Sequence, residues 1–277
     1  MEMPDFADWV GRSCGRDTDE VTDRMVRAYA ATLAGHLAET PPGAAPPGLH
    51  FCLCPALAPP EALGPDGHPA RGTDLPPVPL PRRMWAGGSV ETVTPLRVGE
   101  RVERRSVIGD VAWKRGAAGP LCFVQVRHDY ATARGVALRE VHDIVYRGGG
   151  TGAPPPEPPV RFDVERPVAV DAVALFRFSA LMFNGHRIHY DLPHATGVEG
   201  YDGLVVHGPL QAALLLNLAA DVMGGVPRRF RYRATAPATV PPGGRAALRL
   251  GAVRAGATWR LAVVDADERQ TMIADAE

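Results

Sequence analysis

Lysine is almost missing from this sequence of 277 residues, in which Lys114 is the only lysine among 30 basic residues. The other basic residues are arginines, and 31 acidic residues leave a formal net charge of −1. A nucleic-acid binder needs a broad basic surface that displaces counterions from phosphates. We therefore expect no nucleic-acid partner. Abundant alanine, proline and glycine indicate GC-rich coding, so arginine alone is not taken as a sign of phosphate binding.

Cysteine and long apolar runs are also scarce. The four cysteines are Cys14, Cys52, Cys54 and Cys122. None forms a Cys-x-x-Cys pair, so we expect reduced thiols in a cytosolic protein. The most apolar run, residues 210–220, is interrupted by Gln211 and Asn217 and is too short to span a bilayer. The first residues lack the basic and apolar regions of a signal peptide, so we expect a soluble, cytoplasmic protein that does not enter a membrane.

The remaining composition is that of a globular protein. With 45% apolar and 22% charged residues the chain can bury a normal core, and its length suits one large domain or two small ones. Residues 148–156 are rich in glycine and then proline, which is typical of a linker. We therefore predict a first half over residues 1–147, a linker over 148–160 and a second half over 161–277.

Hydrophobic periodicity predicts helices and strands in both halves. One helix is expected from the capping residues at 17–20 to about His36, and residues 41–81 are expected to be irregular. The predicted strands of the first half form an antiparallel meander: 88–94, 101–111, 121–130 and 136–146. The second half is predicted to have helical segments at 168–183 and within 203–225, and strands at 228–236, 246–253 and 259–264.

A faint internal repeat relates the two halves at an offset of 146 residues. The sequence Pro-Arg-Arg-Met at 81–84 matches Pro-Arg-Arg-Phe at 227–230. Chance is the alternative in a chain so rich in arginine and proline, but two halves of similar size favour duplication. The same offset sets Gly43 opposite His189, so the second half would carry the chemistry and the first would be a degenerate half that binds substrate or supports the structure.

Two segments of the second half carry candidate chemistry. Residues 183–191 read Phe-Asn-Gly-His-Arg-Ile-His-Tyr-Asp, and the apolar stretch before them breaks at Asn184-Gly185, a pair that favours a turn. A turn at the end of a packed element holds short polar side chains in fixed positions.

The other segment, residues 203–210, reads Gly-Leu-Val-Val-His-Gly-Pro-Leu. Proline is well tolerated at the first helical position, so Gly208 is the predicted N-cap of a buried helix that begins at Pro209. A buried helix start aims N–H groups at one point, which suits a carbonyl oxygen that gains negative charge. Since Pro209 has no N–H, the N–H of Gly208 is the predicted donor.

Together the two segments resemble the hydratase-2 motif of MaoC-like hot-dog enzymes, in which an Asp and a His five residues apart precede a His-Gly pair at a helix start. Asn184 stands at the Asp position and His189 at the His position. With this amide and residues 206–210, the chain looks like the type 2 hydroxyacyl-thioester dehydratases and mesaconyl-coenzyme A hydratases. Residues 64–69 and 79–88 resemble the same group, so the resemblance covers nearly the whole chain.

The resemblance implies an α+β fold of two fused hot-dog units, each an antiparallel sheet wrapped around a central helix. It also implies a reversible hydro-lyase that hydrates enoyl thioesters and dehydrates 3-hydroxyacyl thioesters, with short-chain or dicarboxylic acyl groups of the mesaconyl or itaconyl type favoured. The thioester partner is coenzyme A or an acyl carrier protein. No separate cofactor is expected, because coenzyme A is part of the substrate, and another copy of the chain is the expected protein partner.

In this reaction His189 is the predicted base that takes a proton from the attacking water. Asn184 would orient that water, and the N–H of Gly208 would stabilise the enolate-like oxygen. An amide cannot be a general acid, so protonation at C2 falls to His189 or to the same water. His207 and Pro209 are assigned to substrate binding, with a brace of the helix start as the alternative for His207.

Two arginines are further candidates for substrate binding. Arg187 could hold a substrate carboxylate or a coenzyme A phosphate, because a guanidinium binds such anions through two hydrogen bonds. Arg233 belongs to a strand in which arginines alternate with apolar residues. His186 and His189 could be metal ligands, but neither a His-Glu-x-x-His helix nor paired cysteines accompany them, so no metal is predicted. His68 is interpreted as a turn residue or as part of the substrate entrance.

Two other functions are compatible with the sequence. A thioesterase shares the hot-dog fold but usually needs a carboxylate at the position of Asn184. A non-catalytic acyl-binding subunit is the other alternative, because a fold alone does not determine the chemistry of its site.

Overall fold

The computed structural model describes residues 3–116, 119–148 and 161–277, so the predicted linker lies, except for Gly148, outside the described residues. The first half contains β1 (Ser13–Glu20), β2 (Arg82–Thr92), β3 (Arg101–Gly116), β4 (Gly119–Thr132) and β5 (Gly135–Arg147). The second half contains β6 (Val164–Asp171), β8 (Arg229–Ala234), β10 (Arg245–Ala255), β11 (Thr258–Val264) and β12 (Gln270–Ala276). Two short strands, β7 (Leu204–Val205) and β9 (Thr239–Val240), pair separately with each other.

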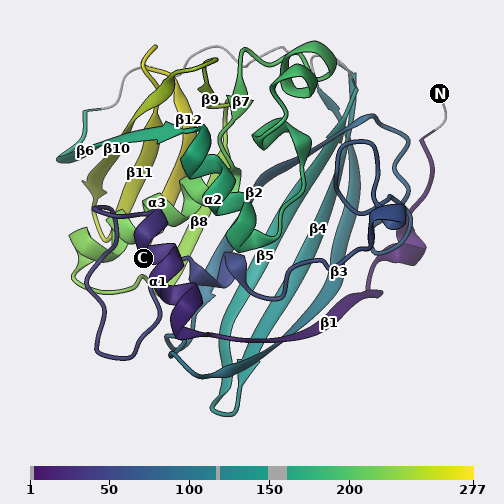
Figure 1. The fold of residues 1–277 in the computed structure, drawn as a ribbon. Coiled ribbons are helices and arrows are strands. Elements are labelled where there is room, and N and C mark those ends of the chain that lie inside the picture. The colour runs from purple at the N-terminus through teal and green to yellow at the C-terminus, as the bar shows by residue number, and fades with distance from the viewer. Residues whose placement is uncertain (1–2, 117–118, 149–160) are drawn as a thin grey trace.

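Within the described ranges, ten strands form one antiparallel sheet in the order β1-β3-β4-β5-β2-β8-β12-β11-β10-β6 (Figure 1). The order is symmetric about the β2–β8 junction. Each half places its first strand at an outer edge, its second long strand at the junction and a three-stranded meander between them. At the junction Gly88 lies opposite Tyr232 and Val90 opposite Phe230. Matching segments of the two halves thus pair with each other, as a duplication predicts.

In the described residues three α-helices accompany this sheet: α1 (Asp23–Thr32), α2 (Ala172–Met182) and α3 (Gly208–Met223). The shorter helical turns are η1 (Ala7–Trp9), η2 (Leu49–Cys52), η3 (Pro60–Ala62), η4 (Arg187–His189) and η5 (His194–Val198). Thr22 caps α1 by accepting a hydrogen bond from Met25 N (3.1 Å), and Asp171 caps α2 by accepting one from Ala174 N (2.9 Å). Each half therefore begins with an edge strand that leads directly into a capped helix.

Several local predictions were wrong at the starts of the halves. Residues 17–20, expected to cap a helix, lie in β1, where Asp17 pairs with Arg104 of β3 at 3.2 Å. Pairing with the edge of the sheet overrides the capping preference, and α1 begins only at Asp23. Val168 likewise lies within β6, which continues to Asp171, and α2 begins only at Ala172. The four predicted first-half strands are present, but only β3, β4 and β5 form a meander, because β2 pairs with β5 and β8 rather than with β3. Strand β12 was not predicted.

Helix α3 is the centre of the main core. Its residues from Leu210 to Ala220 are all buried, and the helix packs on β10, β11, β12, β8 and β2. In the described part of the first half, residues 41–81 contain only η2 and η3, so the long central helix belongs to the second half. The α+β class is confirmed. One apolar cluster includes side chains from both halves, such as Val90, Leu215 and Phe230.

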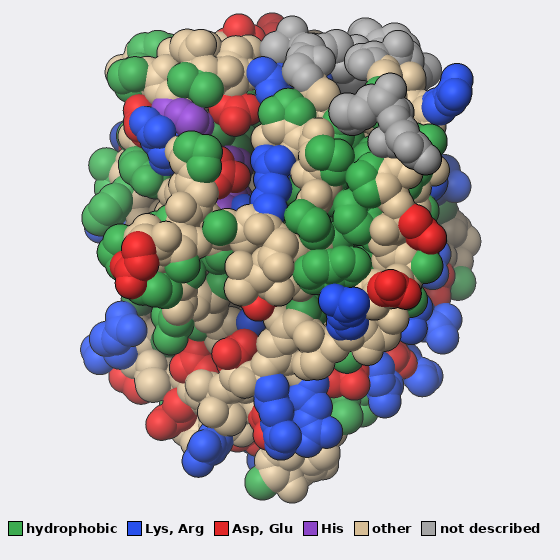
Figure 2. All heavy atoms as spheres, turned by 90° about the vertical axis from the view of Figure 1, so that its right-hand side faces the viewer, with side chains coloured by type: hydrophobic (Ala, Val, Ile, Leu, Met, Phe, Trp, Pro, Cys, Tyr) green, Lys and Arg blue, Asp and Glu red, His purple; other side chains and the backbone are tan. Residues whose placement is uncertain are grey.

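The helices and the surface charge relate to two expectations from the sequence, namely that the chain does not enter a membrane and that it has no nucleic-acid partner. Among the described residues no helix is both long and apolar enough to cross a membrane. On the face drawn in Figure 2, basic side chains are interspersed with acidic ones. Some of the basic and acidic side chains of the sheet form cross-strand ion pairs, such as Arg16–Glu103 (3.0 Å).

Asn217 interrupts the apolar sequence of α3 because it ties the first half to this helix. Its Oδ1 accepts from Ala38 N (3.1 Å), and its Nδ2 donates to Pro47 O (2.9 Å) and Ala213 O (2.8 Å). We predict that Asn217→Ala lowers the free energy of unfolding by about 2 kcal/mol, because a buried N–H loses its acceptor. Denaturant titration measures this, with the exposed Asp267→Asn as a control; equal stability of the two variants would contradict the assignment.

Candidate active site

The end of α2 positions the histidine loop, residues 183–191. The helix stops at Met182, and Phe183 adopts the left-handed conformation with φ of 50°. Asn184 N then donates to Ser179 O (2.9 Å), while Asn184 Oδ1 accepts from His186 N (2.9 Å). The predicted turn is therefore present, with Phe183 as its left-handed residue. The amide oxygen of Asn184 is used within the loop, which leaves its Nδ2 as the group to orient a water molecule.

His189 lies in η4 and is buried at 6% exposure. Its Nδ1 is 2.7 Å from Val205 O, and because a carbonyl can only accept, Nδ1 carries the ring proton in the neutral form. The lone pair is then on Nε2, and no described residue hydrogen-bonds to that atom. Burial, opposed by the bond to Val205 and assisted by His68, lowers the pKa of His189 to about 4. The side chain is thus held as a neutral base.

His207 is stacked against His189, with ring centroids 3.6 Å apart and an angle of 16° between the planes. It is fully buried, and its Nε2 lies 2.8 Å from Ser179 Oγ. Burial, together with nearby His189 and His186, lowers the pKa of His207 well below its usual value. This placement favours the bracing role over direct substrate binding, with the hydroxyl of Ser179 as its partner.

Gly208 is the first residue of α3, and His207 rather than Gly208 is the N-cap. Its N–H therefore belongs to the first turn, where a helix has no intrahelical acceptors. The six-membered ring of Trp85 covers Gly208 so closely that a Cβ there would overlap Trp85 Cε3. Trp85 comes from β2, so a side chain of the first half covers the start of the second-half helix. Pro209 is the second helical residue, one position later than the first helical position predicted for it.

The Asp66 loop, residues 64–69 of the first half, contacts the histidine loop through its backbone. Asp66 O accepts from Arg187 N at 2.9 Å, and a Cβ on Gly67 would overlap the carbonyl oxygen of Gly185. Gly67 has a φ of +84°, which also favours glycine. The two loops can approach this closely only with glycines at the contact.

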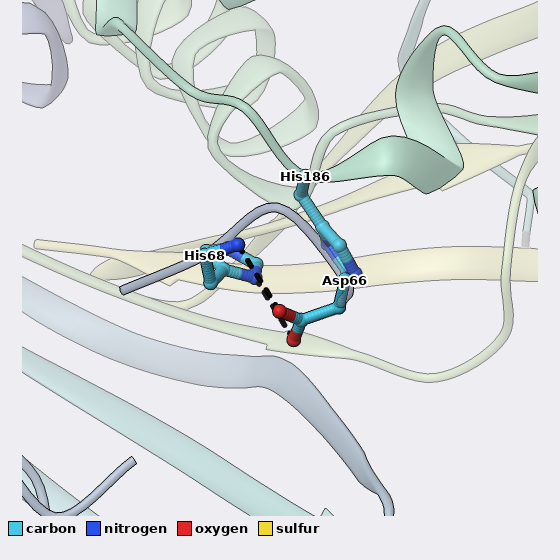
Figure 3. A group of neighbouring side chains, drawn as sticks. All are labelled: Asp66, His68 and His186. Carbon is cyan, nitrogen blue, oxygen red and sulfur yellow. Dashed lines mark hydrogen bonds and ion pairs between the residues drawn. The ribbon is translucent and has the colours of Figure 1, made fainter. Parts of the chain in front are cut away.

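This contact brings Asp66, His68 and His186 together (Figure 3). His68 Nδ1 lies 3.5 Å from Asp66 Oδ2, and the ring centroids of His68 and His186 are 4.1 Å apart. His186 in turn meets His189 edge to face, with centroids 5.4 Å apart. A chain of contacts therefore runs from the first-half carboxylate to the predicted base.

Charge within this cluster is balanced by Arg83 of β2, whose Nη2 lies 3.7 Å from Asp66 Oδ2. Burial alone would raise the pKa of Asp66, but the bonds to His68 and the charge of Arg83 hold it below its usual value. Burial lowers the pKa of His68, an effect that Asp66 opposes and Arg83 reinforces. Burial also lowers the pKa of His186, with neighbouring His68 and His189 adding to the effect.

The same three side chains offer ligand atoms within 4.8 Å of one another. Two imidazoles bound at about 2.0 Å to one tetrahedral zinc would have ring centroids roughly 5 Å apart, whereas those of His68 and His186 are 4.1 Å apart and tilted by 44°. The Arg83 guanidinium also repels a cation at Asp66. The donor set therefore fits an ion-pair cluster better than a metal centre.

The two predicted substrate arginines lie in different places. Arg187 is engaged: its Nε and Nη2 donate to Asp191 Oδ2 at 2.9 and 2.7 Å, and its Nη1 donates to Pro65 O at 3.1 Å. It thereby holds the two loops together. Arg233 is exposed on β8, next to the buried Tyr232, so its side chain is on the opposite face of the sheet from Tyr232. The structure thus brings His189, Asn184, His207 and Gly208 together but does not bring Arg233 to them.

Three contacts were missed from the sequence. Ser179 directly follows the apolar Phe178 in α2, and no sequence motif marked it as a functional residue. Trp85 and Asp66 belong to segments that carry the family resemblance, yet neither was assigned a role. Only the β2–β8 pairing shows that Trp85 covers Gly208, and only the loop contact shows that Asp66 faces the histidine loop.

Comparison with known proteins agrees with this geometry. The family described as hydroxyacyl-thioester dehydratase type 2 matches residues 48–240. A mesaconyl-C(4)-CoA hydratase of Chloroflexus aurantiacus is 42% identical over 247 residues, which cover 86% of each chain. A solved MaoC-like dehydratase aligns with a TM-score of 0.72 at 15% identity over 97% of both chains. A Mycobacterium tuberculosis protein with a double hotdog fold aligns with a TM-score of 0.57 at 15% identity over 99% of this chain and 97% of its own.

The fold is therefore of the double hot-dog, MaoC-like class. The chain belongs to the hydroxyacyl-thioester dehydratase type 2 family. Both expectations from the sequence are confirmed.

Gly208→Ala tests the helix start. The added methyl group must displace either Trp85 or the first turn of α3, and with it the N–H of Gly208. We predict a fall in kcat of about 100-fold, as for loss of one oxyanion donor. Gly225→Ala, just beyond the same helix and in open space, is the matched control. Activity of Gly208→Ala equal to that of the control would exclude the proposed donor.

The acidity of His189 predicts the pH dependence. A histidine acts as a base only in its neutral form, and an ordinary histidine becomes protonated as the pH falls through about 6.5. Because burial lowers the pKa of His189 to about 4, we predict that kcat/KM changes little between pH 7 and pH 5.5. A profile measured with tryptophan fluorescence as a check on folding tests this. A loss of activity centred at pH 6.5 in folded protein would contradict it.

Proposed function

We propose that the chain catalyses reversible hydration of enoyl thioesters through His189, with Asn184 and the N–H of Gly208 as its supporting groups. The reaction class itself follows from family membership and from 42% identity to a hydratase: the chain is a hydro-lyase of acyl thioesters. The observation that carries the assignment of residues is the tautomer of His189. Its proton is fixed on Nδ1 by Val205 O, so Nε2 is free to accept another.

In the hydration direction the water oxygen bonds to C3 while its proton moves to His189 Nε2. The C2–C3 π electrons shift toward the thioester, whose oxygen gains negative charge. Gly208 N–H, in the first turn of α3, stabilises that oxygen together with the positive end of the buried helix. Nδ2 of Asn184 donates to the water and sets its direction of attack. When C2 is protonated and His189 is neutral again, the cycle is complete; dehydration follows the same path in reverse.

We propose a short-chain dicarboxylic acyl group of the mesaconyl or itaconyl type as the substrate. The similarity to the Chloroflexus hydratase, along most of both chains, supports it. Arg187 is held by Asp191 and Pro65, so binding the free carboxylate there would require the guanidinium to exchange one of these partners. Coenzyme A is the proposed carrier, with an acyl carrier protein as the alternative. The cytoplasm as compartment and a homo-oligomer as assembly remain predictions.

A thioesterase is the competing function. Thioester hydrolysis usually needs a carboxylate as nucleophile or base, and Asn184 occupies the corresponding place. Asp66 is the carboxylate beside the histidine loop, but its Oδ1 accepts from His68 N (3.1 Å) and its Oδ2 faces Arg83. An anion paired in this way is a weak nucleophile. We therefore favour the hydro-lyase over both the thioesterase and a non-catalytic acyl-binding subunit.

A substrate screen with His189→Ala tests the proposal. Crotonyl-, itaconyl-, mesaconyl- and long-chain enoyl-coenzyme A are monitored by loss of the enoyl absorbance, and a thiol reagent detects released coenzyme A. We predict hydration without thiol release, fastest with a dicarboxylic acyl group. For His189→Ala we predict that kcat falls by roughly 1,000-fold or more, which is the upper range for removal of a general base and here includes the loss of water positioning. His36→Ala, at a half-buried histidine that follows α1 and is not part of the histidine loop, is the control. Unchanged hydration by His189→Ala would rule out the catalytic role, and thiol release would favour the thioesterase.

A further inference from the structure

The reaction described above leaves one proton unassigned. Asn184 stands where the related motif has an acid, and an amide neither donates nor accepts a proton usefully at neutral pH. C2 must nevertheless gain a proton in hydration and lose one in dehydration. The described residues around the histidine loop supply a second imidazole with an adjacent carboxylate, and both come from the first half of the chain.

The geometry points to His68 as the residue that exchanges the proton with C2, and to Asp66 as the residue that positions and polarises it. This inference rests on the proposed hydro-lyase function. A metal site formed by Asp66, His68 and His186 is disfavoured by the charge of Arg83 and by the close, tilted contact between the two imidazole rings. A site for a substrate carboxylate is disfavoured as well, because Asp66 would repel it.

His68 and His189 share one arrangement of ring nitrogens. In each, Nδ1 faces an atom that can only accept a hydrogen bond: Asp66 Oδ2 at 3.5 Å and Val205 O at 2.7 Å, respectively. The hydrogen bond to Val205 O fixes the proton of neutral His189 on Nδ1. Nδ1 of His68 forms no hydrogen bond with a described residue, but the neighbouring carboxylate favours the proton on that nitrogen, so that Nε2 holds the lone pair. No described residue hydrogen-bonds to Nε2 of either ring. His186 touches both, so the two free nitrogens belong to one cluster built from the two loops.

The two rings differ in what stabilises their charged forms. His189 has the carbonyl of Val205 and the stacked ring of His207, neither of which carries a negative charge. His68 has the carboxylate of Asp66. A proton taken up by the cluster is thus better placed on His68 than on His189, since an imidazolium beside a carboxylate gains Coulomb energy. The groups that face His68 are Asp66 and Arg83 from the first half and His186 from the histidine loop.

The proton count closes with both rings neutral at rest. As the C3–O bond forms, His189 Nε2 takes the proton from water and the thioester becomes an enolate. That proton passes through water in the site to Nε2 of His68. His68 then protonates C2, the enolate electron pair forms the C2–H bond, and the thioester carbonyl is restored. In dehydration neutral His68 removes the C2 proton first.

Hydrogen exchange at C2 separates this arrangement from one in which His189 moves both protons. A saturated acyl-coenzyme A of the preferred chain length has no water to lose, so its exchange with D2O requires only a C2 base and the enolate donor at Gly208. Mass spectrometry follows deuterium uptake. We expect His189→Gln to lose hydration at least 100-fold but to retain exchange within about 3-fold of the parent enzyme. We expect His68→Gln to lose both at least 30-fold with KM changed less than 3-fold.

Asp66→Asn adds a second measurement, the pH dependence of C2 exchange, which would not change if Asp66 had only a structural role. Asparagine can still accept from His68 N at Oδ1, and the backbone bond from Asp66 O to Arg187 N is unaffected, so the loop contact is retained. In the His189→Gln background, where His189 no longer titrates, loss of the carboxylate lowers the pKa of His68. The exchange rate should therefore fall at neutral pH, and its acid limb should move to lower pH. Glu61→Gln, an exposed carboxylate in the nearby η3, should change neither.

The outcomes are decisive in both directions. Exchange retained by His189→Gln and lost by His68→Gln, with the acid limb shifted by Asp66→Asn, supports the assignment. Exchange that survives in folded His68→Gln, or that is lost with His189→Gln, overturns it, as does a parent enzyme that hydrates enoyl thioesters but exchanges no C2 hydrogen. Failure of the hydro-lyase function would be seen separately, as absence of hydration by the parent enzyme. Circular dichroism and thermal melting of each variant establish that it is folded.

Discussion

Strand β2 of the first half pairs antiparallel with β8 of the second half, and the position of the active site depends on this pairing. It joins two five-stranded units into one sheet and fixes Gly88 opposite Tyr232. As a result Trp85 stacks on Tyr232 with centroids 4.7 Å apart and covers the start of α3 at Gly208. Arg83, on the same strand, reaches the carboxylate of Asp66. The predicted base and the predicted oxyanion donor lie in the second half, but β2 and the Asp66 loop of the first half complete the site.

Burial is the second constraint, and it determines how the histidines behave. His189, His207 and His186 are all nearly inaccessible, and charging one of them is opposed by desolvation and by the other rings. A buried cluster of histidines without a carboxylate would resist protonation, whereas the reaction requires a proton to be held briefly. Asp66 provides the missing negative charge, and Arg83 keeps that charge paired at rest. The acid absent at Asn184 is thus offset by an acid from another part of the fold.

The sequence predicted the elements that depend on local pattern. The meander strands, the buried α3 and the residues of the histidine loop follow from periodicity, turn preferences and motif spacing. It failed where tertiary pairing competes with local preference: residues 17–20 favour a helix start but lie in β1, because β3 offers partners such as Arg104. The faint repeat at 81–84 and 227–230 was informative, since those residues lie at or next to the starts of the strands that meet at the junction.

The part of the site that is built from both halves of the chain could not be predicted from the sequence, because it depends on a contact between distant segments. Asp66 and His186 are separated by more than a hundred residues, and nothing in either segment encodes the other. Their contact depends on backbone approach between Gly67 and Gly185, which the pattern Asp-Gly-His presents only as a turn. Likewise the guanidinium of Arg187 is a group suited to binding anions, but Asp191, four positions further along the chain, forms an ion pair with it.

The central claim, that His189 is the base opposite the Gly208 donor, is tested most directly by a crystal structure of the Asn184→Ala variant with a bound 3-hydroxyacyl-coenzyme A. The account predicts the 3-hydroxyl oxygen within hydrogen-bond distance of His189 Nε2 and the thioester oxygen at the N–H of Gly208, with Nδ1 of His189 still bonded to Val205 O. A thioester whose C3 lies away from His189, or whose carbonyl oxygen does not approach the start of α3, would contradict it.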